Sequence, residues 1–384
     1  MKAQSADVII VGGGVMGCAA AYHLAKDGKR VLLIEQFTIG HNKGSSNGAS
    51  RLFRLIHDGM DYVQLARAAE RAWRDLEADS DQRLLQRVDG LDIGTAKTLA
   101  GFRVTMESAG VWFEALDRAE IMHRFPQFAL PENTLGFYQT DYGLIAADRT
   151  LSTLASKLLL HGATIAESES VQQLRASGDG VEVRTEKGKY HGERLVLAAG
   201  PWIGPLTRQL GLALPLTVTK ELSTYYKPTD MEAFMPGRFP IFRHHLTGGT
   251  ARWGVGFPIF EHVGVKMVMD CAGPVVDPDD PDRTPVAVQQ DEAREYAAGI
   301  LPTLGGDIIE TETCLYTMTP DEHFIIDCHP DFPQIVIASP CSGAGFKFAP
   351  LIGRILADLA TSGTTQYNIE RFRLDRAGLK NGKV

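Results

Sequence analysis

The feature that most constrains the fold is a strand, glycine turn, helix and second strand within the first 35 residues. Residues 7–11 (DVIIV) form a fully apolar run that leads directly into glycines. Residues 15–26 carry small and apolar side chains at helical spacing, and Gly28 follows as a helix stop. Residues 30–35 (RVLLIE) complete a βαβ unit. A unit this short predicts the opening of a doubly wound α/β sheet.

The glycine turn fits the pattern G-x-G-x-x-G through Gly12, Gly14 and Gly17. The first glycine permits a tight turn, the second lets the backbone approach a pyrophosphate, and the third allows the helix to pack closely on the strand. The helix N-terminus, with Val15 and Met16, presents NH groups and a positive dipole end to phosphates. The pattern predicts a dinucleotide site.

Glu35 ends the second strand, about 20 residues after the turn. A carboxylate at this place accepts hydrogen bonds from ribose hydroxyls, which favours FAD or NAD over NADP. The pattern by itself does not separate FAD from NAD.

Composition limits the class of protein further. A length of 384 residues predicts two or three domains, or one core with a large insertion. A net charge of -8 argues against a general binder of nucleic acid or anionic membranes. No apolar run reaches the roughly 18 residues of a membrane span, and the N-terminus lacks a signal-peptide pattern, so a cytoplasmic protein is expected. The five cysteines form no CxxC pair, so we predict neither a metal site nor a disulfide framework.

Further α/β segments occur in the middle and at the end of the chain, and mixed, more antiparallel segments separate them. We therefore expect a nucleotide domain assembled from separate pieces and a second domain built from the insertions. The predicted nucleotide domain comprises residues 1–85, 145–215 and 314–384, and the second domain comprises residues 86–144 and 216–313.

Three later segments distinguish FAD from NAD. They are residues 44–54 (GSSNGASRLFR), 312–327 (ETCLYTMTPDEHFIID) and 342–348 (SGAGFKF). With the glycine turn they resemble, in order and spacing through nearly the whole chain, the monomeric sarcosine oxidase family of flavin amine oxidases. That family includes N-methyltryptophan oxidase, pipecolate oxidase and an imino acid oxidase of nikkomycin biosynthesis. The resemblance implies a Rossmann-like FAD domain with an inserted mixed-sheet substrate domain, an architecture like that of D-amino acid oxidase.

The resemblance also implies FAD held covalently by a cysteine thioether, here Cys314. A lone cysteine is otherwise most often a small buried hydrophobe, and this is how we interpret the remaining cysteines, which are Cys18, Cys271, Cys328 and Cys341. Other expected FAD contacts are Ser50, Arg51, Gly343, Gly345, Phe346 and Lys347.

A cationic clamp for a substrate carboxylate is implied at Arg54 and Lys347. Arginine offers a two-pronged donor and lysine adds a point charge. Isolated arginines are more often solvated, but the apolar neighbours of Arg54 argue against that. The resemblance also assigns Lys266 to oxygen activation, because a fixed cation stabilises the negative charge that develops on reduced oxygen. The alternative for Lys266 is a lysine on an exposed strand face.

Several pocket positions depart from sarcosine oxidase. Asp270 and Ala344 stand where that enzyme has histidines, and Val255 replaces an aromatic residue, whereas Tyr316 is retained. With an aspartate at position 270, the pocket resembles that of the nikkomycin imino acid oxidase more than that of sarcosine oxidase. Asp92, in GLDIG, is either a second pocket carboxylate or an ordinary strand-edge acid. We therefore expect a substrate that is larger or more polar than sarcosine.

The expected function is a monomeric FAD-dependent oxidase that converts a secondary amino acid, N-methyl or cyclic, to an imine and reduces O2 to H2O2. Its catalytic residues would be Lys266, Arg54, Lys347, Tyr316 and Asp270. Three alternatives stay open: a sarcosine oxidase proper, an FAD amine dehydrogenase that passes electrons to a carrier, and a non-catalytic FAD-binding protein.

Overall fold

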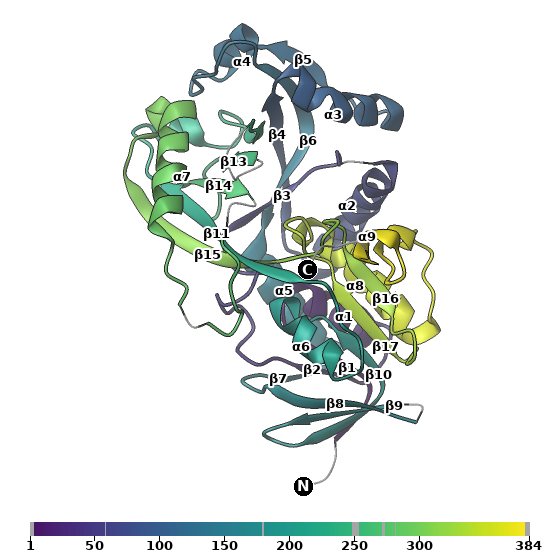
Figure 1. The fold of residues 1–384 in the computed structure, drawn as a ribbon. Coiled ribbons are helices and arrows are strands. Elements are labelled where there is room, and N and C mark those ends of the chain that lie inside the picture. Colours follow the sequence, from purple (N-terminus) through teal and green to yellow (C-terminus); the bar gives the residue numbers. More distant parts are fainter. Residues whose placement is uncertain are drawn as a thin grey trace.

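The computed structural model describes residues 4–57, 59–178, 180–247, 253–270, 273–280 and 282–380. Cys271 therefore lies outside the described residues. Two sheets form the molecule, one low and one high in Figure 1. Helices cover each sheet, and the chain passes between the sheets several times.

The first sheet is largely parallel, with the strand order β16-β17-β10-β1-β2-β7 and a β8–β9 hairpin joined to β10. Strand β16 is antiparallel to β17, and β9 is antiparallel to β10. This arrangement confirms the predicted doubly wound sheet. Its strands in the described residues are β1 (Gln4–Val11), β2 (Val31–Ile34), β7 (Thr164–Ala166), β8 (Val171–Ser177), β9 (Gly180–Thr185), β10 (Lys189–Leu197), β16 (Ile325–Cys328) and β17 (Ile335–Ser339).

Helices bury both faces of the first sheet, as parallel strands with apolar residues on each face require. Four helices pack on one face: α1 (Val15–Lys26), α2 (Met60–Ser80), α5 (Ala147–Leu160) and α8 (Ala349–Ser362). Gly353 lets α8 approach α1 closely, because a Cβ there would lie 2.6 Å from the Cβ of Ala19. Helix α6 (Ile203–Arg208) and the β8–β9 hairpin cover the other face.

The second sheet is mixed, with the order β15-β11-β14-β13-β12-β4-β6-β3, and β5 is added beside β6. The β12–β4 pair is parallel and the other pairs are antiparallel. Its strands in the described residues are β3 (Ser50–Phe53), β4 (Leu85–Gly94), β5 (Glu114–Asp117), β6 (Leu135–Ala146), β11 (Thr217–Tyr226), β12 (Ile241–His245), β13 (Trp253–Phe257), β14 (Val265–Asp270) and β15 (Ile308–Met318).

Helix α7 (Ala287–Ile300) packs on the second sheet, where Ala297 and Ile300 join the apolar cluster around Phe242. This stretch falls in one of the segments expected to be mixed and more antiparallel, so a 14-residue helix here differs from the expectation. Its first turn contains no acidic residue and its N-cap makes no side-chain hydrogen bond. The usual local signal for a helix start is therefore missing. The remaining helices are α3 (Ala96–Ala109), α4 (Arg118–Arg124) and α9 (Ala377–Lys380).

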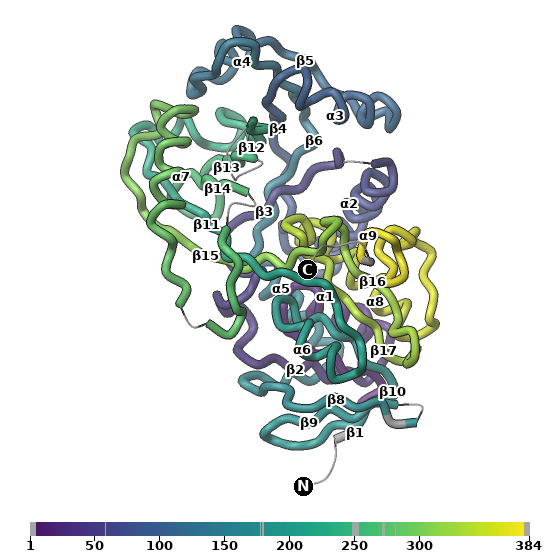
Figure 2. Tube along the Cα trace, viewed as in Figure 1, coloured from purple at the N-terminus to yellow at the C-terminus, as the bar shows by residue number. Residues whose placement is uncertain are grey.

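The tube in Figure 2 shows that segments far apart in the sequence meet between the sheets. The C-terminal α8, in yellow-green, lies beside the N-terminal α1, and β10 alone separates β17 from β1 in the first sheet. Strand β3 belongs to the second sheet, although its residues fall in the first predicted nucleotide segment. The division into two domains at the predicted boundaries stays a prediction.

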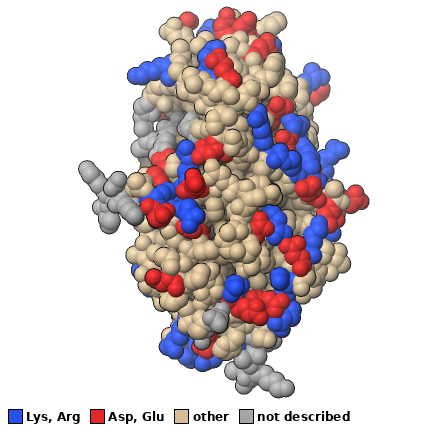
Figure 3. Space-filling view, turned by 90° about the vertical axis from the view of Figure 1, so that its right-hand side faces the viewer, with Lys and Arg blue, Asp and Glu red and all other residues tan. Residues whose placement is uncertain are grey.

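The surface view in Figure 3 shows acidic and basic side chains close to one another around uncharged areas on the face drawn. Within the described residues, every helix is too short or too polar to cross a membrane. The same residues contain no group of three or more His, Cys, Asp or Glu side chains with the geometry of a metal site.

Candidate active site

A cavity of about 690 Å³ is lined by residues from both sheets. That volume lies within the range of about 300–1,000 Å³ that is usual for ligand and cofactor pockets. Of the residues predicted for the site, all but Gly17 line it. Gly17 instead packs against the turn, where a Cβ would lie 1.9 Å from the carbonyl oxygen of Gly12. Sequence segments separated by more than 300 residues thus contribute to one wall.

The glycine turn between β1 and α1 has the close approaches that its sequence predicts. Gly12 has φ = 109°, and a Cβ there would lie 2.4 Å from the carbonyl oxygen of Ala198. Glu35 at the end of β2 is buried, and its Oε2 accepts a hydrogen bond from Gly13 N at 2.6 Å. Ser46 Oγ accepts from Val15 N at 3.1 Å, so a cavity-lining side chain already contacts the helix N-terminus.

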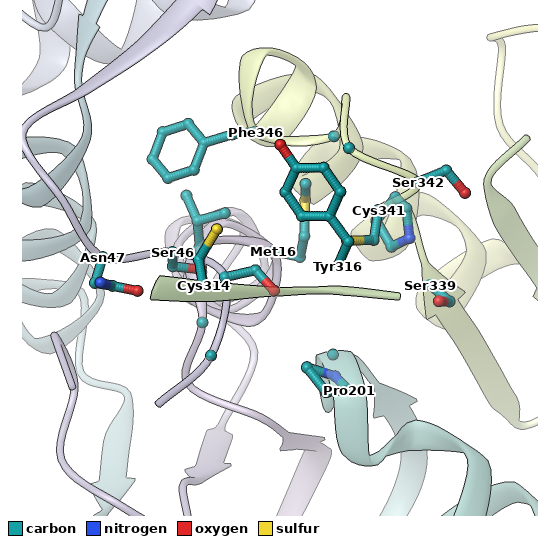
Figure 4. A pocket seen from close by; sticks show the side chains of 18 of the residues that line it. Met16, Ser46, Asn47, Pro201, Cys314, Tyr316, Ser339, Cys341, Ser342 and Phe346 are labelled. Carbon is teal, nitrogen blue, oxygen red and sulfur yellow. The ribbon is translucent and has the colours of Figure 1, made fainter. Parts of the chain in front are cut away.

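Three buried polar atoms of the cavity wall lack hydrogen-bond partners among the described residues. One is His57 Nε2, and the other two are Asn47 Oδ1 and Ser339 Oγ. A buried polar atom without a partner costs free energy, so native structures generally satisfy such atoms with protein, water or ligand. Together with the glycine turn, these atoms fit a large polar cofactor such as FAD. Figure 4 shows Asn47 and Ser339 at the cavity with Met16 and Pro201.

The SGAGFKF loop closes the cavity near Tyr316. Gly343 has φ = 72°, and a Cβ there would lie 2.9 Å from the Tyr316 ring. A Cβ on Gly345 would lie 1.7 Å from the carbonyl oxygen of Pro340. A side chain at either position would therefore push the loop out of place.

Cys314 and Tyr316 lie two residues apart on β15, so their side chains project from the same face of the strand. Figure 4 shows both on the side of the strand that faces Phe346. Cys314 is a half-buried residue and forms no disulfide bond with another described cysteine. Burial raises its pKa to about 11, while the nearby cations Arg51 and Lys266 oppose the shift.

Lys266 is buried on β14, directly between its register partners Tyr225 on β11 and Phe257 on β13. Its Nζ lies 5.6 Å and 5.7 Å from these two ring centres and donates to Ser50 O at 3.2 Å. Burial, reinforced by the charge of Arg51, lowers the pKa of Lys266 to about 8. The alternative of an exposed strand-face lysine is therefore wrong.

Arg51 is held beside Lys266 by the loop before β3. Its guanidinium donates to Ser45 O at 3.0 Å and to Asn47 O at 2.7 Å, and it lies 5.4 Å from the centre of the Phe346 ring. The loop carbonyls therefore fix the cation at the cavity wall.

Arg54 and Lys347 are both buried and both line the cavity. Burial lowers the pKa of Lys347 well below its usual range, and the charges of Arg54 and Arg243 lower it further, whereas Asp270 raises it. Trp73 Nε1 donates to Lys347 O at 2.7 Å and fixes the backbone at this residue. Two buried cations side by side form a strong site for an anion.

Arg243, on β12, is a cavity residue that the sequence analysis missed. Its Nε donates to Asp92 Oδ1 at 3.0 Å, and Asp92 also accepts from Tyr142 OH. Asp92 is buried behind Arg243 and does not line the cavity. It is therefore neither a pocket carboxylate nor an ordinary strand-edge acid, the two alternatives that the sequence suggested. Its pKa is lowered by Arg243 and His245, against the effect of burial.

His57 is a second cavity residue that the sequence analysis missed. It is buried, and its Nε2 has no hydrogen-bond partner in the described part of the chain. Burial, followed by the charges of Lys347 and Arg54, lowers its pKa well below the usual range. No local sequence signal distinguishes this histidine from a surface one.

Asp270 lies at the end of β14 and accepts a hydrogen bond from Tyr316 OH at 3.0 Å. Val255 and Ala344 line the same cavity. These three pocket positions, at which the sequence departs from sarcosine oxidase, therefore meet around one space.

Comparison with known proteins agrees with this arrangement. Residues 7–359 match the family described as FAD dependent oxidoreductase. The chain is 31% identical to the monomeric sarcosine oxidase of a Bacillus species (strain NS-129), with 98% of both chains covered. It is 29% identical to the N-methyl-L-tryptophan oxidase of Salmonella arizonae, covering 96% of this chain and 98% of that one.

A solved structure of NikD, an unusual amino acid oxidase essential for nikkomycin biosynthesis, has a TM-score of 0.87 and 30% identity to this chain. The match covers 96% of this chain and 97% of that one. The chain belongs to the FAD-dependent oxidoreductases and, within them, to the sarcosine oxidase and N-methyl amino acid oxidase type. The predicted fold class and the predicted class of enzyme are confirmed.

Proposed function

We propose that this protein oxidises a secondary amino acid at its C–N bond and reduces O2 to H2O2. The observation that carries the proposal is the meeting of two buried cations, Arg54 and Lys347, with the glycine turn on one cavity. Bound FAD would supply the chemistry that accepts a hydride equivalent from the substrate and passes two electrons to oxygen.

The protein's part is to position the substrate and to place charge. Arg54 and Lys347 would hold the carboxylate, which fixes the carbon next to the amine relative to the cavity wall. Tyr316 and Asp270, joined by their hydrogen bond, lie where they would contact the amine or the side chain of the substrate. Asp270 would favour a protonated nitrogen by its charge.

The cofactor would be held by the glycine turn, Glu35, Ser50, Arg51 and the SGAGFKF loop, and covalently by Cys314. The half-buried Cys314 on the cavity wall supports this attachment. Arg51 and Lys266 would favour the thiolate that forms the bond, since a nearby cation stabilises an anionic sulfur.

The proposal is tested by adding sarcosine or L-pipecolate to the yellow protein without oxygen and then admitting air. We expect at least one of them to bleach the flavin absorbance, and air to restore it with one H2O2 per turnover. Bleaching by sarcosine would identify a sarcosine oxidase, and bleaching by L-pipecolate an oxidase of cyclic amino acids. Restoration without peroxide would favour a dehydrogenase. No bleaching by any secondary amino acid would contradict the proposal.

The reaction with oxygen is expected to depend on pH through Lys266. The charged form of the amine is the one that stabilises negative charge on oxygen, and it is present below its pKa of about 8. We therefore expect a constant rate below pH 8 and a falling rate above it. Stopped-flow mixing of reduced enzyme with oxygenated buffer from pH 6 to pH 10 measures this profile. A rate that increases through pH 8 would argue against a charged Lys266.

The charged and titratable groups around this amine come from four elements. They are Arg51 on β3, Asp148 on α5, Tyr225 on β11, and Glu312 and Cys314 on β15. A Glu312→Gln variant removes one neighbouring carboxylate that raises the pKa of Lys266, so its rate should fall at lower pH than in the wild type.

A further inference from the structure

Arg243 is fixed by an acidic and an imidazole side chain on the side away from the cavity. On the parallel strands β12 and β4, Arg243 and Asp92 are direct register partners. His245 lies two residues further along β12, so its side chain is on the same face as that of Arg243. Its Nε2 lies 3.3 Å from Asp92 Oδ1 and 3.2 Å from Arg243 Nη2. Because Asp92 is 1% exposed, it requires the charged partner that Arg243 provides.

The same contacts leave one part of the guanidinium available. Aromatic rings flank it, with Arg243 Cζ 4.7 Å from the ring centre of Phe102 and 5.1 Å from that of Trp253. Its Nε and Nη2 are used by Asp92 and His245, whereas Nη1 makes no hydrogen bond to the described residues. Since Arg243 lines the cavity, this nitrogen is a donor for a bound ligand.

The charges of the described residues around Arg243 would be unbalanced with a substrate bound. A substrate carboxylate bound beside Lys347 would favour its charged form. Arg54, Lys347 and Arg243 would then supply three cationic groups, against the two carboxylates Asp92 and Asp270. A zwitterionic amino acid with one carboxylate adds no net charge. A second carboxylate on the substrate would balance the third cation, which is the arrangement that a site with little water favours.

We propose that the substrate carries a second acidic group and that Arg243 binds it. The proposed class of substrate is an N-substituted amino acid that carries two carboxylates. One carboxylate lies on Arg54 and Lys347 and the other on Arg243, with Asp92 and His245 as positioning residues. The inference rests on the proposed function, because it concerns the substrate of the same reaction.

Binding of inert acids to the flavin-loaded protein tests the site without turnover. Succinate and butyrate have four carbons each and differ in one carboxylate. We expect succinate to bind about 10- to 100-fold more tightly, as one charge-assisted hydrogen bond to arginine allows. Changes in flavin absorbance on titration give both dissociation constants. Equal constants for the two acids would overturn the proposal.

The matched variant changes both members of the buried pair, Arg243→Gln with Asp92→Asn, because removing the arginine alone would leave a buried carboxylate unpaired. In this variant the preference for succinate should disappear. Arg103→Gln, at a partly exposed arginine of α3 outside the cavity wall, should leave it unchanged. If the double variant still binds succinate more tightly than butyrate, another residue causes the preference, and the role of Arg243 is overturned.

Turnover separates this inference from the proposed function. We expect kcat/KM for racemic N-methylaspartate to exceed that for racemic N-methylalanine at least about 10-fold, and the double variant to lose this difference. If N-methylalanine is preferred, the oxidase function stands and the second acid site is wrong. If succinate binds tightly but no secondary amino acid bleaches the flavin, the acid site stands and the proposed oxidase function is wrong.

Discussion

Replacing Lys266 by methionine is expected to slow the reaction of the reduced enzyme with O2 by about 10²- to 10³-fold, the usual effect of removing one fixed charge-stabilising group from an active site. The effect should be large because Lys266 is buried between Tyr225 and Phe257, where water cannot replace its charge. Methionine has a similar length and no charge. The anaerobic reduction by substrate should change little, since Arg54 and Lys347 are intact.

The matched control is Lys220→Met on the neighbouring strand β11. Lys220 is also buried, but its Nζ donates to Thr284 O at 2.8 Å and it does not line the cavity. Its loss should affect stability and leave the reaction with O2 near the wild-type rate. Rapid mixing of each reduced variant with oxygenated buffer provides the comparison. Equal slowing in both variants would mean that Lys266 acts through folding rather than through oxygen.

Replacing Cys314 by serine is expected to change the flavin from fully retained to fully released when the protein is denatured in acid. Serine preserves the size of the side chain and removes the sulfur that would form the thioether. Because the glycine turn and the SGAGFKF loop are unaltered, the native variant should still bind FAD without a covalent bond. Flavin fluorescence of the protein band after denaturing electrophoresis measures the attachment.

Cys341→Ser is the control for this experiment, because Cys341 is another free cysteine on the same cavity wall. Figure 4 shows Cys314 and Cys341 on either side of Tyr316. The control variant should keep its covalent flavin. Retention of flavin by Cys314→Ser, or its release from the wild type, would contradict the assignment of Cys314.

Local patterns were sufficient to predict the start of the fold. Residues 7–35 contain the strand, turn, helix and acidic residue in immediate succession, and the structure has β1, α1 and β2 there. The α/β segment expected at the end of the chain is also present, as β17 and α8. The resemblance then located cavity residues from segments as distant as Arg54 and Lys347.

The pairing of Arg243 with Asp92 was beyond sequence reasoning. The two residues are 151 positions apart and meet because β12 and β4 lie parallel and in register. The order of strands in the second sheet depends on packing throughout that sheet, and no motif specifies it. Asp92 was therefore noticed without its partner, and Arg243, whose partner gives it a fixed orientation, was not noticed at all. His57 was missed for the related reason that its burial depends on tertiary contacts, with Tyr62 of α2 and with Phe348 at the end of the SGAGFKF loop.

The strand order of the first sheet has a consequence for biosynthesis. Val8 of β1 pairs with Arg194, and Leu195 of β10 pairs with Ile335. At a synthesis rate of about 5–20 residues per second, the ribosome reaches Arg194 about 10–40 seconds after Val8, and it reaches Ile335 later still. During the first interval one apolar edge of β1 emerges from the ribosome without β10, which makes the nascent chain prone to aggregation. Recovery of folded protein should therefore depend on chaperones and on slow expression in the cold.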